Sequence, residues 1–338
     1  MSLLTAALLV LGGAVSASGS DDASFRATAG SAQVSTASTT FALGMRKFNF
    51  ARGKDRLLPT TVWYPARGSS RRSKGHVKLD AAAATGQYPL LLWSHGFYSN
   101  PQMQEHTIKL LAEAGYVVVA PTYPYTKKDA PKFNKYDVPN QAVDASYVIT
   151  QMLKHGNPLA ATIDAQRMGA IGHSGGGTTT NWLFTGKRDP RLRVGVMLAG
   201  RPTTTYQGSP VPLLFVHGDK DPVVAYSQGR DSYRANPWPK AFLTIKGGEH
   251  GAGTGGGERG HHQAITTILD FLDWALNGDD AARLRLEQDA TLVGITSFES
   301  VGIYANAASA TTTSPTATAT ATMPTTQAKA LDRSGPAG

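Results

Sequence analysis

The chain has 338 residues, of which 41% are hydrophobic, with a formal net charge of +9 and no cysteine. This length allows one large or two small domains, and the missing cysteines neither favour nor oppose export. The basic residues are scattered, without interleaved aromatic residues or a recognised binding module, so the charge does not indicate a nucleic-acid partner.

Low-complexity segments are predicted at both ends of the chain. Residues 2–17 form an apolar run that is too short to span a bilayer and is typical of a signal peptide (1–17). We therefore expect a secreted or periplasmic protein without stable membrane insertion. Residues 18–40 are predicted to be a disordered leader, and the Thr-, Ala- and Pro-rich residues 305–338 a disordered tail, because neither segment can bury enough apolar surface to fold.

The intervening residues 41–304 are predicted to form one catalytic domain of the α/β class, because strand and helix patterns alternate from Thr60 to Leu276. Residues 68–84 are interpreted as a poorly ordered insertion. An apolar strand, residues 88–93, ends in the loop Ser94-His95-Gly96-Phe97-Tyr98.

The pentapeptide Gly172-His173-Ser174-Gly175-Gly176 fits the pattern Gly-x-Ser-x-Gly. It follows a short apolar strand and precedes a helix-compatible stretch, which is the context that this motif requires. The turn forces the serine into a strained backbone conformation, and Gly172 and Gly176 lack the Cβ atoms that would crowd it. We therefore expect Ser174 to be a nucleophile.

A nucleophilic serine needs a base and an orienting carboxylate, in the chain order serine, acid, histidine in this fold. Asp219 and Asp221 follow the apolar strand 211–216, and His250 follows the strand 241–245. Three successive strands thus end in loops that each carry one member. The Gly-x-x-Asp spacing favours Asp221 as the acid, and Asp219 is interpreted as a turn residue that bonds its own backbone.

Two backbone N–H groups are expected to form the oxyanion hole. One belongs to Gly175, directly after the nucleophile, and the other to Phe97, where Gly96 lets the chain turn inward. The rings of Phe97 and Tyr98 are expected to hold the acyl group of the substrate. Residues 123–140 border the same cleft, and the sequence leaves open whether they form a lid.

No cofactor or metal is expected. Glu258, His261 and His262 are poor metal ligands together, because adjacent histidines do not share a helix face and no third ligand has helical spacing. The glycine-rich residues 251–256 lack the strand–helix context of a dinucleotide site, and no Walker loop is present.

Together these motifs resemble the α/β-hydrolase superfamily, in its dienelactone-hydrolase-like group, close to cutinase and polyester hydrolases, platelet-activating-factor acetylhydrolases and chlorophyllases. The similarity covers roughly residues 41–277, and residues 56–65 resemble the opening strand of the family. It implies a mostly parallel central sheet with helices on both faces. Polyester hydrolases of the cutinase type carry Met after the serine, Trp after the following strand and a C-terminal disulfide. Here Gly175, the segment 197–201 and the absence of cysteine depart from that pattern.

The sequence therefore predicts a monomeric serine carboxylic-ester hydrolase that forms an acyl-enzyme with neutral esters of short to medium length. No charged group is evident near the acyl site to anchor an acid. Polyester hydrolysis is an alternative that the departures above disfavour. A peptidase or amidase is disfavoured because no peptide-anchoring domain is present, and a non-catalytic binding protein because every triad role is filled.

Overall fold

The computed structural model describes residues 40–69 and 76–304. The expected signal peptide (1–17) and tail (305–338) lie outside these residues, as does the expected leader (18–40) apart from Thr40. In the described part of the chain, no helix combines the length and apolar character that a membrane span needs.

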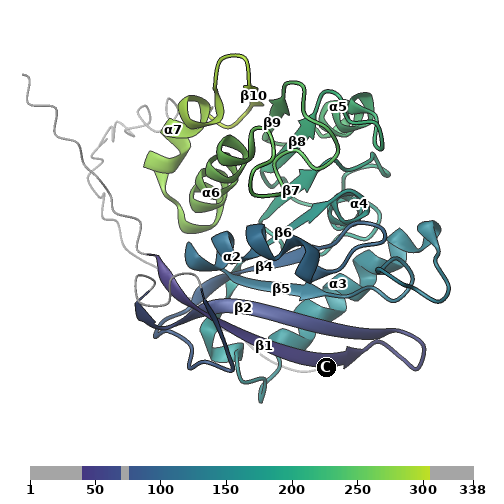
Figure 1. Ribbon diagram of the computed structural model, residues 1–338, viewed down its shortest axis with the longest axis vertical. Coiled ribbons are helices and arrows are strands. Elements are labelled where there is room, and N and C mark those ends of the chain that lie inside the picture. The colour runs from purple at the N-terminus through teal and green to yellow at the C-terminus, as the bar shows by residue number, and fades with distance from the viewer. Residues whose placement is uncertain (1–39, 70–75, 305–338) are drawn as a thin grey trace, which may run out of the picture. The chain divides into compact units, whose positions relative to one another are not determined.

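The described residues form one ten-stranded sheet with the strand order β10-β9-β8-β7-β6-β4-β5-β2-β1-β3 (Figure 1). From β9 through to β5 the neighbouring strands run parallel, whereas β10, β2 and β1 pair antiparallel with β9, β5 and β2. The prediction of a mostly parallel sheet is confirmed. The strands are β1 (Phe41–Ala51), β2 (Leu57–Ser69), β3 (Val77–Leu79), β4 (Tyr88–Ser94), β5 (Val117–Pro121), β6 (Ile163–His173), β7 (Val194–Leu198), β8 (Leu213–Gly218), β9 (Lys240–Ile245) and β10 (Thr296–Val301).

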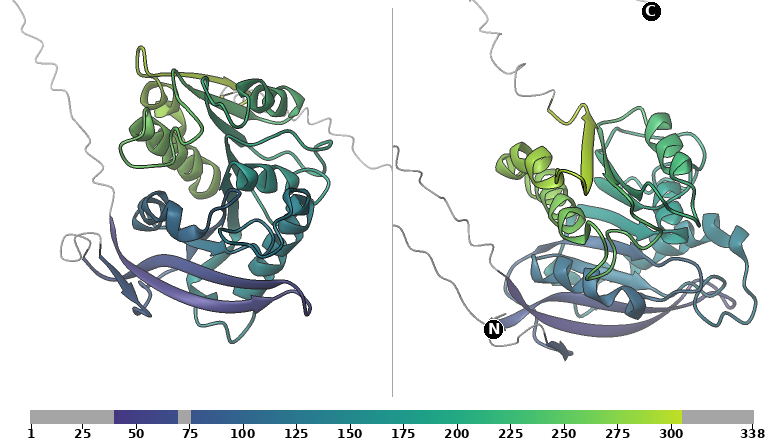
Figure 2. Two further views of the ribbon diagram at one scale, coloured as in Figure 1. Left: turned by 45° about the vertical axis from the view of Figure 1, so that its right-hand side comes forward. Right: turned by 45° about the horizontal axis from the view of Figure 1, so that its top comes forward.

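Helices cover both faces of the sheet, as predicted. On one face lie α2 (Glu105–Glu113), α6 (His261–Asn277) and α7 (Asp280–Ala290), and on the other α3 (Val138–Met152), α4 (Gly175–Trp182) and α5 (Tyr226–Ala235). In Figure 2 the yellow-green α6 and the green α5 lie on opposite sides of the sheet. Three short 3-10 helices are η1 (Pro101–Gln104), η2 (Lys135–Asp137) and η3 (Ala160–Thr162).

Strand β5 shows why the central strands read as continuous apolar runs. Val118 packs into the hydrophobic cluster on the α2 and α6 face, while Val117 and Val119 pack into the cluster on the α3 face. Successive side chains of a strand point to opposite faces, so a strand with both faces covered must be apolar at every position.

The parallel strands end at a common edge, and this edge carries the predicted site. Ser94 at the end of β4 pairs with Gly172, His173 at the end of β6 pairs with Leu198, and Gly218 at the end of β8 pairs with Ile245. One detail of the sequence analysis is wrong. Strand β7 lies between β6 and β8, so the three strands that carry the predicted triad are not successive.

The segment 68–84, interpreted from sequence as a poorly ordered insertion, contains a short strand. Val77–Leu79 forms β3, which pairs parallel with β1 through Leu43↔Val77 and Met45↔Leu79. Tyr64 on β2 also donates a 2.7 Å hydrogen bond to the carbonyl oxygen of Ala81. Residues 70–75 lie outside the described part, whereas the rest of this insertion is tied to the edge of the sheet.

Candidate active site

Ser174 occupies a sharp turn between β6 and α4, with φ +58° and ψ −120°. Positive φ in a residue with a Cβ costs about 1–3 kcal/mol, so the surrounding structure must hold it. A Cβ at Gly172 would collide with the carbonyl oxygen of Gly176, and one at Gly176 with that of Ser94. The Ser174 N–H also donates to Leu198 O at 2.9 Å. The predicted strained turn is therefore confirmed.

The three predicted triad side chains meet above this turn. His250 Nε2 lies 2.8 Å from Ser174 Oγ, and His250 Nδ1 lies 2.8 Å from Asp221 Oδ2. The imidazole is 20% exposed, whereas the Asp221 carboxylate is fully buried. Each ring nitrogen thus has one partner, and the ring joins the hydroxyl to the carboxylate.

Asp221 is surrounded by hydrogen-bond donors. Oδ1 accepts from the backbone N–H groups of Val223 and Val224 at 2.8 and 2.9 Å, and Oδ2 accepts from His250 and from His217 Nε2, the latter at 3.1 Å. Burial alone would raise the pKa of this carboxyl. The hydrogen bonds from His250 and the backbone outweigh burial and lower the pKa below its ordinary value, so Asp221 is ionised at neutral pH.

Asp219 has a different role from the one expected. Its Oδ1 accepts from the backbone N–H of Gly247 at 2.7 Å, instead of from its own turn. Gly247 belongs to the loop that carries His250, so Asp219 ties the acid loop to the base loop. It makes no contact with the His250 ring, which is bonded to Asp221.

His217 supports the acid, and the sequence analysis assigned it no role. It is the last residue but one of β8, four residues before Asp221, and its Nε2–H is shared between Asp221 Oδ2 and Val224 O, the latter 2.9 Å away. Burial lowers its pKa, and hydrogen bonds to Val224 and Asp221 offset only part of this effect. The ring is therefore neutral and acts as a donor to the carboxylate.

A buried chain of hydrogen bonds reaches the backbone of His250. Trp93 Nε1–H donates to Gln104 Oε1 at 2.8 Å, and Gln104 Nε2–H donates to His173 Nδ1 at 3.2 Å. His173 Nε2–H then donates to the carbonyl oxygen of His250 at 2.8 Å. Burial lowers the pKa of His173 to about 4, so the ring stays neutral and keeps this tautomer. The chain anchors the loop that carries the base.

We expect His173→Phe to lower kcat for a simple ester about tenfold with little change in KM, because one hydrogen bond that positions His250 is lost. Steady-state kinetics on the purified variant check this, with His155→Phe as control, because His155 is exposed in the turn after α3. An unchanged kcat, or a loss confined to KM, would contradict a positioning role for His173.

The residues that carry the predicted oxyanion donors lie near Ser174: Gly175 follows it in the chain, and a Cβ on Gly96, directly before Phe97, would lie 3.2 Å from Ser174 Cβ. Among the backbone hydrogen bonds of turns, loops and helix ends in the described residues, none has the N–H of Phe97 or Gly175 as its donor. These bonds therefore leave both N–H groups available to a substrate oxyanion. His95 fixes the first loop: its Nδ1–H donates to Gly96 O at 2.8 Å, and its Nε2 accepts from the Tyr123 N–H at 3.0 Å. Burial lowers the pKa of His95 to about 4, so it is neutral and makes both bonds.

The two predicted aromatic residues differ in position. Phe97 packs so closely on Gly175 that a Cβ there would lie 2.5 Å from Phe97 Cδ1. Its ring lines the cavity next to Ser174. Tyr98 adopts φ +52° and is 62% exposed, with its ring stacked on Phe133 at 4.1 Å between centroids. Of these two residues, Phe97 is therefore the one that lines the cavity beside the nucleophile.

A cavity of about 500 Å³ opens beside Ser174. Its lining residues are Phe97, Lys135, Tyr136, Val138, Pro139, Ser174, Gly175, Thr178, Trp182, Arg201, Val223 and Val224. Four of them, residues 135, 136, 138 and 139, come from the 123–140 segment that was expected to border the cleft. The expectation that no charged group lies near the acyl site is wrong, because Lys135 and Arg201 both line this cavity. We name it the Ser174 cavity.

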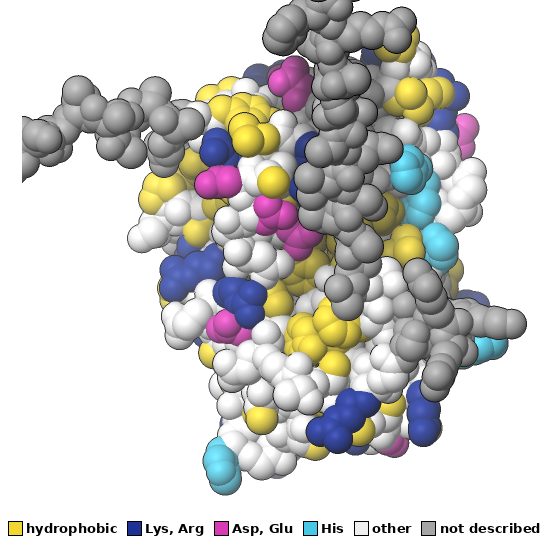
Figure 3. All heavy atoms as spheres, turned by 90° about the vertical axis from the view of Figure 1, so that its left-hand side faces the viewer, with side chains coloured by type: hydrophobic (Ala, Val, Ile, Leu, Met, Phe, Trp, Pro, Cys, Tyr) yellow, Lys and Arg dark blue, Asp and Glu magenta, His cyan; other side chains and the backbone are white. Residues whose placement is uncertain are grey.

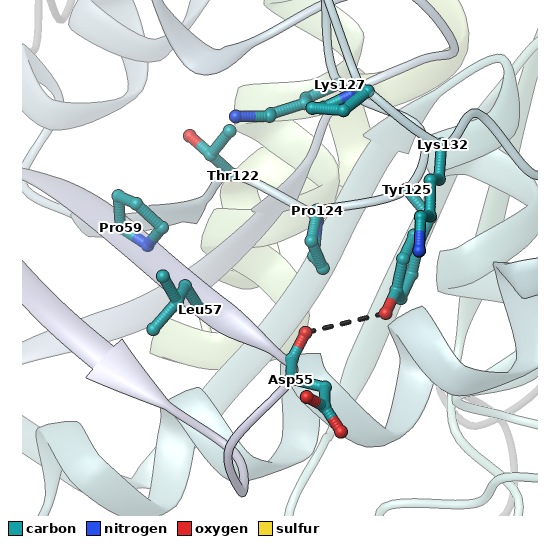
Figure 4. A pocket seen from close by; sticks show the side chains of 9 residues that line it. Asp55, Leu57, Pro59, Thr122, Pro124, Tyr125, Lys127 and Lys132 are labelled. Carbon is teal, nitrogen blue, oxygen red and sulfur yellow. Dashed lines mark hydrogen bonds between the residues drawn. The ribbon is translucent and has the colours of Figure 1, made fainter.

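A second hollow of about 340 Å³ lies between the start of β2 and the segment that follows β5 (Figure 4). Asp55, Leu57 and Pro59 form one side, and residues 122–132 the other. Figure 4 shows the Tyr125 hydroxyl bonded to the Asp55 carbonyl oxygen across it, at 3.5 Å. No member of the predicted triad lines this hollow, so it is separate from the Ser174 cavity.

Comparisons with known proteins identify the family and the fold. The family model described as PET hydrolase-like matches residues 67–280, well over half of the chain. Among solved structures, a ferulic acid esterase from Streptomyces cinnamoneus is similar, with 20% sequence identity and a TM-score of 0.57. The match covers 70% of this chain and 91% of that one. At this identity the likeness shows the fold alone. No curated protein matches the sequence.

Proposed function

The chain belongs to the PET hydrolase-like family of α/β-hydrolases, and from this premise we propose that it is a serine carboxylic-ester hydrolase. One observation carries the proposal: His250 bonds Ser174 Oγ through one ring nitrogen and the ionised Asp221 through the other, both at 2.8 Å. This arrangement allows a weak hydroxyl nucleophile to lose its proton as it attacks.

In the proposed mechanism, Ser174 Oγ attacks the ester carbonyl carbon while His250 Nε2 takes the hydroxyl proton. The carbonyl oxygen becomes an oxyanion, which the N–H groups of Phe97 and Gly175 stabilise. The tetrahedral intermediate then collapses, His250 returns the proton to the departing alcohol oxygen, and Ser174 stays acylated. Water attacks the acyl-enzyme in the same way, with His250 as base, and releases the acid. Asp221 holds Nδ1 protonated and stabilises the imidazolium in both steps.

We further propose that the protein is exported and that it accepts acyl groups of short to medium length. The apolar run over residues 2–17 supports export. The Ser174 cavity supports the length limit, because its volume of about 500 Å³ is bounded by bulky side chains such as Trp182 and Val138. Family membership also makes polyester hydrolysis a second candidate function.

The substrate profile tests this proposal. With 4-nitrophenyl esters of acetate, butyrate, octanoate and palmitate, we expect kcat/KM to peak at butyrate or octanoate. The matched 4-nitroanilide should be cleaved at least about 10³-fold more slowly, since an amide is the less reactive acyl donor. An aromatic polyester film should be cleaved slowly beside these esters. A peak at palmitate would indicate a lipase-like groove, and comparable anilide turnover would indicate an amidase.

A further inference from the structure

The Ser174 cavity carries two cationic side chains among apolar and uncharged polar ones. Of its twelve lining residues, Lys135 and Arg201 are cations, and none is Asp or Glu. Elsewhere the positive charge is dispersed: on the face drawn in Figure 3, Lys and Arg side chains lie in small separate groups. Because both cations line the cavity beside the nucleophile, they can contact a bound substrate. They therefore bear on substrate choice more than the net charge of the chain does.

Arg201 is held in place without being neutralised. Its guanidinium donates to Gln228 Oε1 at 2.7 Å and to Val223 O at 3.1 Å, and its backbone N–H donates to Thr178 Oγ1 at 3.0 Å. All three acceptors are uncharged. Among the described residues Arg201 forms no ion pair, whereas Arg56 pairs with two carboxylates. A guanidinium has five N–H donors, so further donors are left for an anion.

Lys135 is placed on the facing segment by a well-anchored turn. It begins η2, where the Asn134 side chain accepts from the Tyr136 N–H at 3.0 Å. Asp137, which ends η2, forms two hydrogen bonds with Arg56 at 2.9 and 2.7 Å. Lys135 Nζ lies 5.2 Å from the centre of the Tyr136 ring, and among the described residues it has no acidic partner. Its charge is therefore also available to a ligand.

The rest of the lining fits an apolar spacer between the ester and an anionic end. The cavity wall also includes ring and aliphatic surface from Phe97, Trp182, Val138, Pro139 and Val224. Burial of such a spacer is favourable by itself, and a carboxylate beyond it would meet Arg201 or Lys135.

We propose that the preferred substrates are half-esters of dicarboxylic acids, which carry a free carboxylate at the far end of an apolar spacer. This inference rests on the proposed ester hydrolysis at Ser174 and replaces the sequence-based expectation of a preference for neutral esters. Arg201 and Lys135 bind the carboxylate and set specificity. The reaction that supplies such a substrate is the cleavage of one ester bond in a diester or polyester, because that cleavage leaves a free carboxylate on the product.

The test compares mono(4-nitrophenyl) suberate with methyl 4-nitrophenyl suberate, which differ only in whether the remote end is charged. At low ionic strength we expect kcat/KM about fivefold higher for the acid than for the methyl ester, as is usual for exposed charge pairs. The ratio should fall towards one in 0.5 M NaCl, because salt screens exposed charges. Arg201→Gln and Lys135→Gln should each lower kcat/KM for the acid about two- to threefold, through KM, and leave the methyl ester within about 1.5-fold.

Arg193→Gln is the matched control, because it also removes one exposed arginine. Arg193 directly precedes β7 and so lies at the amino ends of the parallel strands, whereas the site lies at their carboxyl ends. It should leave the ratio unchanged, and equal melting curves should show that all variants fold. A ratio of one in the parent protein, or an equal fall of the ratio in the control, would overturn the proposal while ester hydrolysis stands. Failure to cleave either suberate would instead overturn the proposed function.

Discussion

Ser174→Ala should lower kcat for a short ester by about 10⁴-fold or more, because the other triad members act only through this hydroxyl. The parent protein should be labelled covalently by a fluorophosphonate, and the variant should not. A non-catalytic binding protein would not be labelled at all. Ser209→Ala, at an exposed serine away from the Ser174 cavity, serves as the control and should keep both activity and labelling. Activity within tenfold of the parent would contradict the role of Ser174.

A second variant at the same position separates catalysis from folding. Ser174→Gly should be as inactive as Ser174→Ala. It should be more stable than both the parent protein and the alanine variant, because glycine adopts φ +58° without the penalty that a Cβ incurs. For a chain of this size a gain of about 1 kcal/mol corresponds to a rise in Tm of about 2–4 °C. A fall in Tm in Ser174→Gly would show that the hydroxyl supports the fold and would remove the basis for assigning strain to this turn.

The predicted triad positions were accessible from sequence because each depends on local chain geometry. Gly172 and Gly176 permit a turn that other residues would block, and that turn identifies Ser174. The parallel strands then bring distant loops to one edge of the sheet, so a histidine after one strand and an aspartate after another can meet. For these residues, a location just after a predicted strand was enough to predict the site, because the parallel sheet brings those loops together.

The residues that support the triad could not be found in the same way. Gln104 lies on η1, and only the packing of η1 against the end of β6 brings its amide between Trp93 and His173. Arg201 follows β7 and reaches the Ser174 cavity because Gln228 and Val223 hold its guanidinium there. His217 gave one usable signal: it lies near the end of β8, four residues before Asp221.

The edge elements were missed for a related reason. Helix α7 buries only Ala282, Leu286 and Ala290, so its sequence has a weak helical pattern, and its start depends on Asp279, whose side chain accepts from the Ala282 N–H at 3.1 Å. Strand β3 has three residues and is ordered by pairing with β1. Such short elements take their stability from neighbours that only the tertiary structure supplies.

Asp221→Asn should lower kcat about 10³- to 10⁴-fold, whereas Asp219→Asn should stay within about threefold of the parent. At position 221 the new amide N–H would face His250 Nδ1 and favour the tautomer with the proton on Nε2, which cannot accept the proton of Ser174 Oγ. The Asn variant would also lose the negative charge that stabilises the imidazolium. At position 219 an asparagine Oδ1 can still accept from the Gly247 N–H, which is the contact that Asp219 makes.

The two variants are isosteric and carry the same change in charge, two residues apart in one loop, so each is the control for the other. Burst kinetics with a 4-nitrophenyl ester would separate acylation from deacylation, and both steps should slow in Asp221→Asn because His250 is the base in each. Equal melting curves would exclude a folding defect at this buried carboxylate. If Asp219→Asn were instead the slower enzyme, the acid role would pass to Asp219, and the 2.8 Å contact between Asp221 and His250 would have to be structural.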